Sequence, residues 1–340
     1  MKVLLVLLLL ALALTAVWVL RHPAFGPHPL RHNPTTYENE IPTPQFTGDV
    51  SMTKALWDFL TARDNNRVPK HPIPAIKTNL TNLPTDTDWI IWFGHSSYLF
   101  QLAGLRVLVD PLLRMEFPAS MMMRPFPGTD ISAPEDIPEV DLLVITHEHW
   151  DHMDYATLRD LRSKVHHVVC PLGIAEYLVF WGYSPDIITE MNWYEKCLIS
   201  NDKCQITCLP TRHFSNRLFS RNHTLWASFM VECGARRVYI GGDGGYDDRF
   251  RRIHEQFGTI DLAIMENGQY NTQWANIHML PEHLEQAMLD LQADQYLTVH
   301  HDKFALARHP WQEPDSVAQR IAEEHHLRLL DTTIGSLITF

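Results

Sequence analysis

The segment THEHWDHMD at residues 146–154 places three histidines and three carboxylates within nine positions. The apolar run DLLVI at 141–145 precedes it and predicts a buried strand, and DYATLRDL at 154–161 predicts a helix. The cluster is therefore expected where a strand leads into a helix. Strand ends and the loops after them are where α/β proteins usually carry functional side chains.

The spacing within this segment predicts metal binding. Residues two apart in a strand point to the same side, so His147 and His149 can direct their imidazoles to one point. Asp151 and His152 follow at the turn and can reach a second point nearby. Imidazole and carboxylate groups are ligands for zinc, iron and manganese. A H-x-H-x-D-H pattern favours a metal site over a solvated charged loop.

Further metal-ligand side chains stand at three other predicted strand ends. His213 follows a strand near 203–210, Asp243 lies in the glycine-rich turn GGDGG, and His300 and His301 end a strand at 295–300. Each histidine alone would more often be a core or surface residue. Together they predict a site completed by residues distant in the sequence.

Composition bounds the class of protein. The chain has 340 residues, of which 45% are hydrophobic and 20% charged, values typical of a globular protein with a sizeable core. The net charge is −12, and the sequence contains no Lys/Arg-rich run. Nucleic-acid binding through phosphate contacts is therefore not expected.

The five cysteines show no CxxC spacing, and their number is odd. A disulfide framework is not expected in a domain of this size. Cys197 and Cys204 flank the turn SNDK, so a cross-hairpin bridge between them is an alternative in an oxidising compartment. Small apolar strand residues are the favoured interpretation.

An uncharged run, VLLVLLLLALALTAVWVL, extends from Val3 to Leu20. As a helix it would span roughly 27 Å, close to the thickness of the bilayer core. This length favours an uncleaved membrane anchor, with a cleaved signal segment and a secreted or periplasmic protein as the alternative. Lys2 precedes the run and Arg21 follows it, so the charges do not determine which side of the membrane the domain occupies.

Three regions follow from this pattern. Residues 1–20 form the anchor or signal segment, residues 21–87 an extended lead-in with a short helix at 51–63, and residues 88–340 the regular domain. Residues 88–111 predict two strands joined by a turn at Ala103-Gly104. Strands then alternate with helices, which predicts an α/β fold of two mixed sheets packed together with helices outside.

The order of several motifs resembles the metallo-β-lactamase superfamily. The motifs are GHSS at 94–97, VDP at 109–111, THEHWDH at 146–152, His213, GGDGG at 241–245 and VHH at 299–301. The chain looks most like the branch of N-acyl-phosphatidylethanolamine-hydrolysing phospholipase D and its bacterial relatives. The likeness extends over about residues 33–330. It implies a four-layer αββα sandwich with the metals at one edge.

The resemblance also implies two divalent metal ions that share an activated hydroxide, with zinc expected first and iron or manganese as alternatives. One ion would take His147, His149 and His213, the other Asp151, His152 and His300, and Asp243 would bridge them. Asp151, Asp243 and His278 would have catalytic roles, with His278 as an acid or as a donor to a phosphoryl oxygen.

Other residues would support these ligands. Asp110 is expected to accept a hydrogen bond from a ligand imidazole. His95 is expected either beside the ligands or in the core, and His301 either behind the ligands or against the substrate. The chain departs from the branch at Gly244, where relatives usually have threonine, and at 301–303, where they commonly have Trp-Gly-Thr.

These features predict a dinuclear metal-dependent hydrolase, a phosphodiesterase of phospholipase D type acting on a lipid or amphiphile. The Met- and Phe-rich loop at 114–128 is expected to contact an acyl chain or a membrane, or to pack beneath its own turns. A lactone or ester hydrolase of the same fold and a non-catalytic membrane-anchored metal protein are the alternatives. The physiological substrate, the metal and the oligomeric state are left open.

Overall fold

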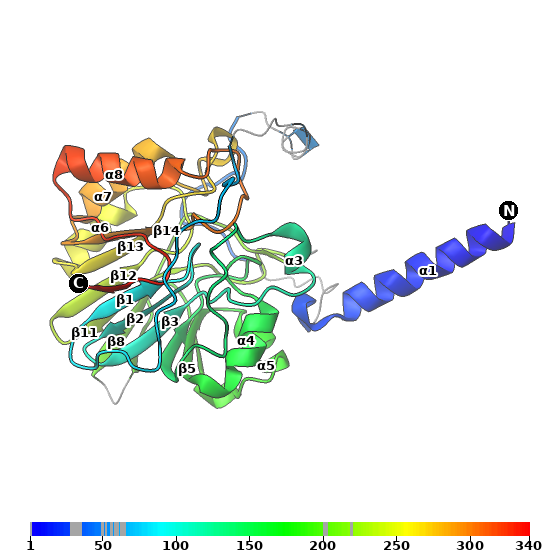
Figure 1. Cartoon of the computed structure of the whole chain (residues 1–340), viewed down its shortest axis with the longest axis horizontal. Helices are drawn as coiled ribbons and strands as arrows, with labels where there is room; N and C mark the ends of the chain where they lie inside the picture. The colour runs from blue at the N-terminus through cyan, green and yellow to red at the C-terminus, as the bar shows by residue number, and fades with distance from the viewer. Residues whose placement is uncertain are drawn as a thin grey trace.

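Two mixed β-sheets lie face to face at the centre of the computed structural model, with helices on both outer faces (Figure 1). The structure describes residues 2–27, 36–48, 51, 53–54, 57, 61, 66–199, 203–217 and 220–340. This arrangement confirms the predicted α/β fold with two sheets, the αββα sandwich.

The first sheet has seven strands. In spatial order they are β15 (Leu337–Thr339), β1 (Trp89–Trp92), β2 (Tyr98–Leu102), β3 (Leu105–Val109), β4 (Val140–Val144), β5 (Val165–Pro171) and β6 (Ile188–Met191). The pairs from β15 to β3 are antiparallel, and those from β3 to β6 are parallel. The carboxyl ends of β3 and β4 therefore meet at one edge.

The second sheet has six strands. They are β14 (Tyr296–Val299), β13 (Leu262–Glu266), β12 (Arg236–Ile240), β11 (Ser228–Cys233), β8 (Cys204–Leu209) and β7 (Lys196–Ile199). Strands β14, β13 and β12 are parallel, whereas β11 is antiparallel to both β12 and β8. Strand β8 consequently runs in the same direction as β12 and ends at the same edge.

The helices cover the outer faces of the two sheets. They are α4 (Tyr155–Leu161) and α5 (Ala175–Phe180) on the first sheet, and α6 (Arg249–Phe257), α7 (Pro281–Leu291) and α8 (Glu313–His325) on the second. The smaller elements are α1 (Lys2–Arg21), η1 (Pro23–Phe25), α3 (Ala119–Met122), η2 (Arg162–Lys164), η3 (Pro185–Ile187), β9 (Asn216–Arg217), β10 (Ser220–Arg221) and η4 (Thr272–Trp274).

Apolar residues on both faces of the strands produce three cores. In β1, Ile90 and Trp92 belong to the core between the sheets, whereas Trp89 and Ile91 pack beneath the helices of the first sheet. A third core lies between the second sheet and helices α6 to α8. A slip of one residue would exchange the two side-chain sets between cores of different shape, which close packing opposes.

The structure differs from the prediction at three places. Residues 88–111 form three strands rather than two, because Gly94 and His95 adopt positive φ angles and turn the chain after β1. Residues 187–199, whose sequence predicts a single strand, form β6 and β7 in different sheets, since the chain crosses between the sheets after Met191. The Met- and Phe-rich loop predicted at 114–128 contains the one-turn helix α3. The predicted helix at 51–63 falls largely outside the described residues.

A disulfide joins Cys204 to Cys233, which face each other on β8 and β11. Cys170, Cys197 and Cys208 are free thiols. The expectation of five unpaired strand cysteines was therefore wrong, and so was the alternative pairing of Cys197 with Cys204. The correct pair depends on which strands are neighbours in the sheet. Strand β11 pairs with β8 in the sheet, although it lies outside the predicted hairpin in the sequence.

Helix α1 occupies the predicted apolar segment and projects away from the sandwich (Figure 1). Across the described residues, no helix combines the length and the apolar character needed to cross a membrane. Attachment of residues 3–20 to a membrane and the regional boundaries at residues 20 and 87 stay predictions.

Candidate metal centre

The seven predicted ligands gather at one edge of the sandwich, although they follow four different strands. The residues at 147–152 follow β4, His213 follows β8, Asp243 follows β12 and His300 follows β14. These strands end at the edge where the two sheets meet, so loops from both sheets deliver side chains to one place. Asp154 begins α4 by accepting a hydrogen bond from the Thr157 backbone N–H, which anchors the end of the ligand segment.

Three imidazoles converge in a first group. Nε2 of His147 lies 2.9 Å from Nδ1 of His149, which lies 3.2 Å from Nε2 of His213. Oδ2 of Asp243 lies 3.8 Å from Nε2 of His147 and 3.9 Å from Nε2 of His213. One ligand atom from each of the four residues lies within 4.8 Å of the others.

A second group contains Asp151, His152, His300 and His95, whose ligand atoms also lie within 4.8 Å of one another. Oδ2 of Asp243 lies 3.2 Å from Nε2 of His152, and its Oδ1 lies 3.3 Å from Nδ1 of His300. The Asp243 carboxylate thus faces both groups at once. A carboxylate in this position could be shared by two cations.

The protonation of these imidazoles fits cation binding. Nδ1 of His213 lies 2.9 Å from the carbonyl oxygen of Ile277 and donates to it, which leaves the lone pair of the neutral ring on Nε2. Burial lowers the pKa of His147 and His213 well below the usual value and that of His149 to about 4. The three rings are therefore neutral near pH 7. A neutral imidazole carries one N–H group, so the facing nitrogens of the three rings do not have enough protons for each to take part in a full hydrogen bond.

Unpartnered buried atoms point to the same conclusion. Among the described residues, Nε2 of His152 and Oδ1 of Asp243 are buried and have no hydrogen-bond partner. Burial opposes ionisation of Asp243, but the His152 and His300 imidazoles hold the pKa of its carboxyl well below the usual value. A cation would satisfy both kinds of atom, and the residues present fit one or more divalent metal ions.

Asp110 makes the contact that the resemblance implies. Its Oδ2 lies 2.7 Å from Nδ1 of His152 and accepts a 2.5 Å hydrogen bond from the hydroxyl of Thr146, while its Oδ1 accepts from the Thr146 backbone N–H at 2.8 Å. The imidazole of His152 is thereby oriented with Nε2 toward Asp243. Such outer partners set the tautomer and the direction of a metal-binding histidine.

His95 and His301, which the sequence could not place, lie in different environments. Nε2 of His95 is 2.9 Å from Oδ2 of Asp151, and its ring centroid is 4.2 Å from that of His300, so His95 lies beside the predicted ligands. The ring of His301 instead packs 4.9 Å from Trp92, with its Nε2 3.2 Å from the carbonyl oxygen of Thr298. Adjacent residues thus point to opposite sides of the β14 end.

Glu266 is a site residue that the sequence reasoning missed. It is the last residue of β13, and its Oε2 lies 2.7 Å from Nδ1 of His278. Its Oε1 accepts a hydrogen bond from the backbone N–H of Met279, and burial raises its pKa to about 7. The ring of His278 lies 5.1 Å from His213 and 5.4 Å from His300. The sequence feature that could have identified Glu266 is its position as a carboxylate at the end of a strand, at the edge where the metal ligands were predicted.

Asn39 was also missed, because residues 21–87 carry no regular pattern. Its side-chain amide donates to the carbonyl oxygen of His213 at 2.7 Å and accepts from the His213 N–H at 3.1 Å. These two bonds hold the backbone of a predicted ligand from a segment far away in the sequence.

The departure at Gly244 has a local compensation. A Cβ atom on Gly244 would lie 1.9 Å from the hydroxyl oxygen of Thr211, so the space of a side chain there is already filled. The Thr211 hydroxyl donates to the carbonyl oxygen of Asp243 at 2.7 Å. Thr211 therefore places a hydroxyl group beside Asp243 and fills the space next to Gly244.

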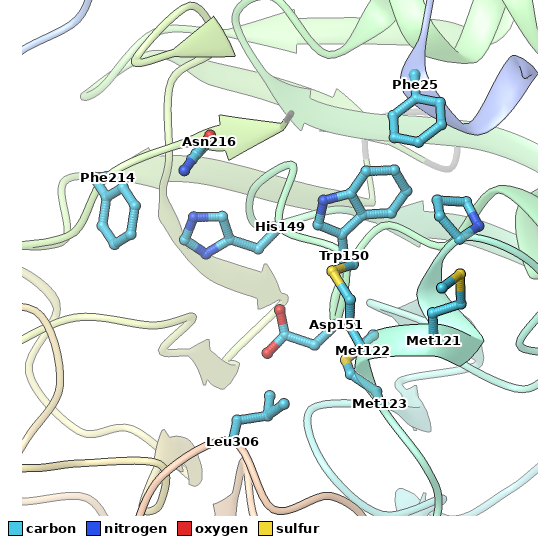
Figure 2. A pocket seen from close by; sticks show the side chains of 11 residues that line it. Phe25, Met121, Met122, Met123, His149, Trp150, Asp151, Phe214, Asn216 and Leu306 are labelled. Carbon is cyan, nitrogen blue, oxygen red and sulfur yellow. The ribbon is translucent and has the colours of Figure 1, made fainter. Parts of the chain in front are cut away.

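An apolar cavity of about 590 Å³ opens directly onto the cluster. His149 and Asp151 form part of its wall, with Phe214 on one side and Trp150 and the methionines on the other (Figure 2). The lining residues are Phe25, Pro118, Met121, Met122, Met123, His149, Trp150, Asp151, Phe214, Asn216 and Leu306. Met121 is 76% exposed, whereas Met123 is buried against Phe304 and its neighbours, so the methionine-rich loop both packs beneath itself and presents apolar side chains.

Comparison with known proteins identifies relatives of this chain. Residues 105–301 match the sequence model of the Beta-lactamase superfamily domain. An uncharacterized protein of Mycobacterium tuberculosis is 35% identical over 299 residues, which cover 86% of this chain and 79% of that protein.

Two further similarities concern a curated enzyme and a solved structure. N-acyl-phosphatidylethanolamine-hydrolyzing phospholipase D 1 of Caenorhabditis elegans is 33% identical over 198 residues, which are 54% of this chain and 54% of that protein. The chain thus spans about half the length of that relative. Igni18, a metallo hydrolase of the archaeon Ignicoccus hospitalis, superposes with a TM-score of 0.57 at 19% identity over 75% of this chain and 98% of that one. At that identity the likeness concerns the fold alone.

The neighbours His300 and His301 provide a matched test of the cluster. We expect His300→Ala to weaken metal binding by more than the roughly 10- to 100-fold typical of losing an outer partner, because His300 faces Asp243 directly. His301→Ala should retain the metal and lower only the thermal stability, since it removes a buried ring. Elemental analysis after dialysis against a competing chelator checks both variants, and equal metal content in the two would contradict the assignment.

Proposed function

Because the chain belongs to the metallo-β-lactamase superfamily, in the branch that includes the N-acyl-phosphatidylethanolamine-hydrolysing phospholipases D, we propose that it hydrolyses phosphodiesters of lipids or other amphiphiles. It is a metallo-hydrolase of the β-lactamase fold. The observation that supports the narrower proposal is the apolar cavity whose wall includes His149 and Asp151, two members of the predicted metal cluster.

We propose that the cluster holds two divalent cations, with zinc as the first candidate and iron or manganese as alternatives. His147, His149 and His213 would hold one, Asp151, His152 and His300 the other, and Asp243 would be shared. When bound, such a pair lowers the pKa of bound water and offsets negative charge on the oxygens at the attacked centre. The protein contributes the fixed directions of these ligands, through Asp110, Asn39 and the strand ends.

His278 is proposed to move a proton or hydrogen-bond a phosphoryl oxygen. Its Nδ1 is held by Glu266, which leaves the Nε2 side of the ring available beside the cluster. Burial opposes a positive charge, but the Glu266 carboxylate raises the pKa of His278 above its usual value. A protonated ring can donate to the departing oxygen and so avoid an unstable alkoxide.

The cavity is proposed to receive the apolar part of the substrate. Its volume lies within the range of ordinary ligand pockets, and most of its lining side chains are apolar or aromatic. Methionine side chains adapt to irregular apolar ligands because they are unbranched and flexible. A charged phosphodiester at the cluster with a hydrocarbon group in the cavity matches the polarity of both regions.

Helix α1 is proposed to attach the domain to a membrane. Its leucines at positions 5, 7, 9, 10, 12 and 14 are each more than half exposed. Near its end, Trp18 lies 5.1 Å from Phe117, next to α3 and the cavity. Attachment there would bring the cavity close to a supply of amphiphilic substrate.

A substrate panel tests the reaction class. Metal-loaded protein should cleave N-acyl-phosphatidylethanolamine and related phosphodiesters, and should not cleave lactones or carboxylic esters with the same acyl group. Chelation should abolish activity, and Asp243→Ala should lower kcat by more than the about 10²- to 10³-fold typical of losing a single stabilising group. Asp141→Ala, which changes a half-exposed carboxylate on β4, is the control.

The outcomes of this panel separate the alternatives. Cleavage of lactones or esters alone would replace the proposed substrate class. Metal binding without hydrolysis of any compound would favour a non-catalytic metal protein.

Leaving-group dependence tests His278. We expect His278→Gln to lower kcat by about 10²- to 10⁴-fold with an alkyl leaving group and much less with p-nitrophenol, which departs without protonation. Glu266→Gln should show the same dependence with a smaller loss, because glutamine retains an acceptor but no charge. His283→Gln, one turn into α7 and stacked on Tyr246, is the control. An equal loss with both leaving groups would exclude the acid role.

Vesicle flotation tests the membrane proposal. The full chain should float with phospholipid vesicles, and the double variant Leu9→Lys/Leu12→Lys should partition at least about 100-fold less, because each change removes a leucine worth roughly 1.5–3 kcal/mol of burial and replaces it with a charge. Leu198→Lys changes a similarly exposed leucine on β7 and should float normally. Equal flotation of all three proteins would refute attachment through α1.

A further inference from the structure

One wall of the apolar cavity comes from a short segment directly after helix α1. Phe25, the last residue of η1, lines the cavity together with side chains from residues 118–123, 149–151, 214–216 and 306. Phe25 is only 5% exposed, and the centre of its ring lies 5.4 Å from the centre of the Trp150 ring. Residues 23–25, called here the wall segment, are therefore built into the catalytic domain although they lie in the predicted lead-in.

Two buried side chains hold the backbone of the wall segment. The indole N–H of Trp181 donates to the carbonyl oxygen of Pro23 at 2.9 Å, and Nε of Arg217 donates to the carbonyl oxygen of Ala24 at 2.8 Å. Arg217 is 1% exposed. Burying a guanidinium is costly unless its N–H groups are satisfied, so these hydrogen bonds restrict where the segment can lie.

The same guanidinium holds the segment that carries the predicted ligands. Its Nη1 donates to the carbonyl oxygens of Glu148 at 2.8 Å and Met153 at 3.0 Å, and the group lies 3.8 Å from the centre of the Trp150 ring. Arg217 thus joins the wall segment, the ligand loop and the indole on the cavity wall. These contacts fix the distance from Phe25 to the histidine and aspartate cluster, although Phe25 belongs to the predicted lead-in.

Gly26 permits the close seating of the wall segment. It has a φ of +82°, and a Cβ atom there would lie 2.2 Å from a ring carbon of Tyr177 on α5. Any other residue would be strained and would push the segment away from α5. Gly26 itself lines no part of the cavity, so a change there alters the position of Phe25 without altering the lining side chains.

We propose that Phe25 is a specificity-determining residue that closes the apolar cavity and limits the length of the hydrocarbon group accepted beside His149 and Asp151. The inference rests on the proposed function in one respect, that the cavity receives the apolar part of the substrate. The ligand class is a straight acyl chain, because the lining is formed by flexible methionines and flat aromatic rings with few polar groups. Phe25 is the lining residue supplied by the segment that continues into α1.

A chain-length series on the full metal-loaded protein tests this proposal. Substrates of the class cleaved in the panel, differing only in acyl length, should show kcat/KM rising about fourfold per added methylene until the cavity is filled. Phe25→Ala should move the optimum to longer chains and lower kcat/KM at least about tenfold for the best substrate of the parent protein. Phe25→Trp should move the optimum to shorter chains.

Two further variants distinguish a change in the cavity wall from a nonspecific disturbance of the protein. Phe180→Ala removes a phenyl ring that is 50% exposed on α5 and should leave the length profile unchanged. Gly26→Ala should move the optimum to longer chains as Phe25→Ala does, because it displaces the wall segment. Metal content, measured for every variant, should equal that of the parent. If Phe25→Ala does not fold, the opposite shifts of Phe25→Trp and Phe25→Leu decide the question.

Binding of a fluorescent fatty acid, which carries no phosphodiester bond, to the metal-loaded protein gives a readout without turnover. Phe25→Ala should weaken this binding at least about tenfold, and Phe180→Ala should not change it. An active parent whose length profile is the same in all Phe25 variants would overturn the inference and leave the proposed function intact. If the unsubstituted protein cleaves no compound, the proposed function is wrong. In that case the binding assay still tests the inference, and Phe25→Ala that binds the fatty acid as tightly as the unsubstituted protein would overturn it.

Discussion

The site depends on a concentration of buried imidazoles and carboxylates that hydrogen bonds within the protein satisfy only in part. Asp243 lies between two groups of histidines, and the ring nitrogens of His147, His149 and His213 face one another at hydrogen-bond distances. Without a cation, these lone pairs and the buried carboxylate would oppose folding of the edge where they meet. Metal binding and the stability of this edge are therefore expected to be linked.

The sandwich provides this arrangement because its strands end together. Strands β4, β8, β12 and β14 belong to two sheets, yet all reach the same edge and deliver ligands from loops that a rigid core supports. Outer hydrogen bonds then fix each ring: Asp110 orients His152, Ile277 and Asn39 hold His213, and Glu266 holds His278. An error of about one ångström in such ligands would matter, so the outer contacts are as much a part of the site as the ligands.

The chemistry of the site and the shape of the cavity are consistent with one another. A charged cluster that favours cations and anionic oxygens adjoins a cavity whose lining is mostly apolar, so a substrate with a polar head and a hydrocarbon tail suits both. The wall segment places the end of α1 beside that cavity, since Arg217 contacts both the segment and the ligand loop. The N-terminal residues therefore contribute to the site in addition to any role in attachment.

The sequence by itself determined the fold class, the alternation of strands with helices after residue 140 and the residues that gather at the predicted metal edge. Local periodicity and the spacing within 146–154 carried the α/β class and the first ligand segment, whereas the full ligand set and the sandwich came from the order of motifs that resembles the metallo-β-lactamase superfamily. Only the tertiary structure decided that Cys204 pairs with Cys233, that His300 faces Asp243 while His301 faces Trp92, and that Glu266, Asn39 and Phe25 belong to the site. Those outcomes depend on which distant segments pack together and on the direction of single side chains at strand ends, and no local pattern carries that information.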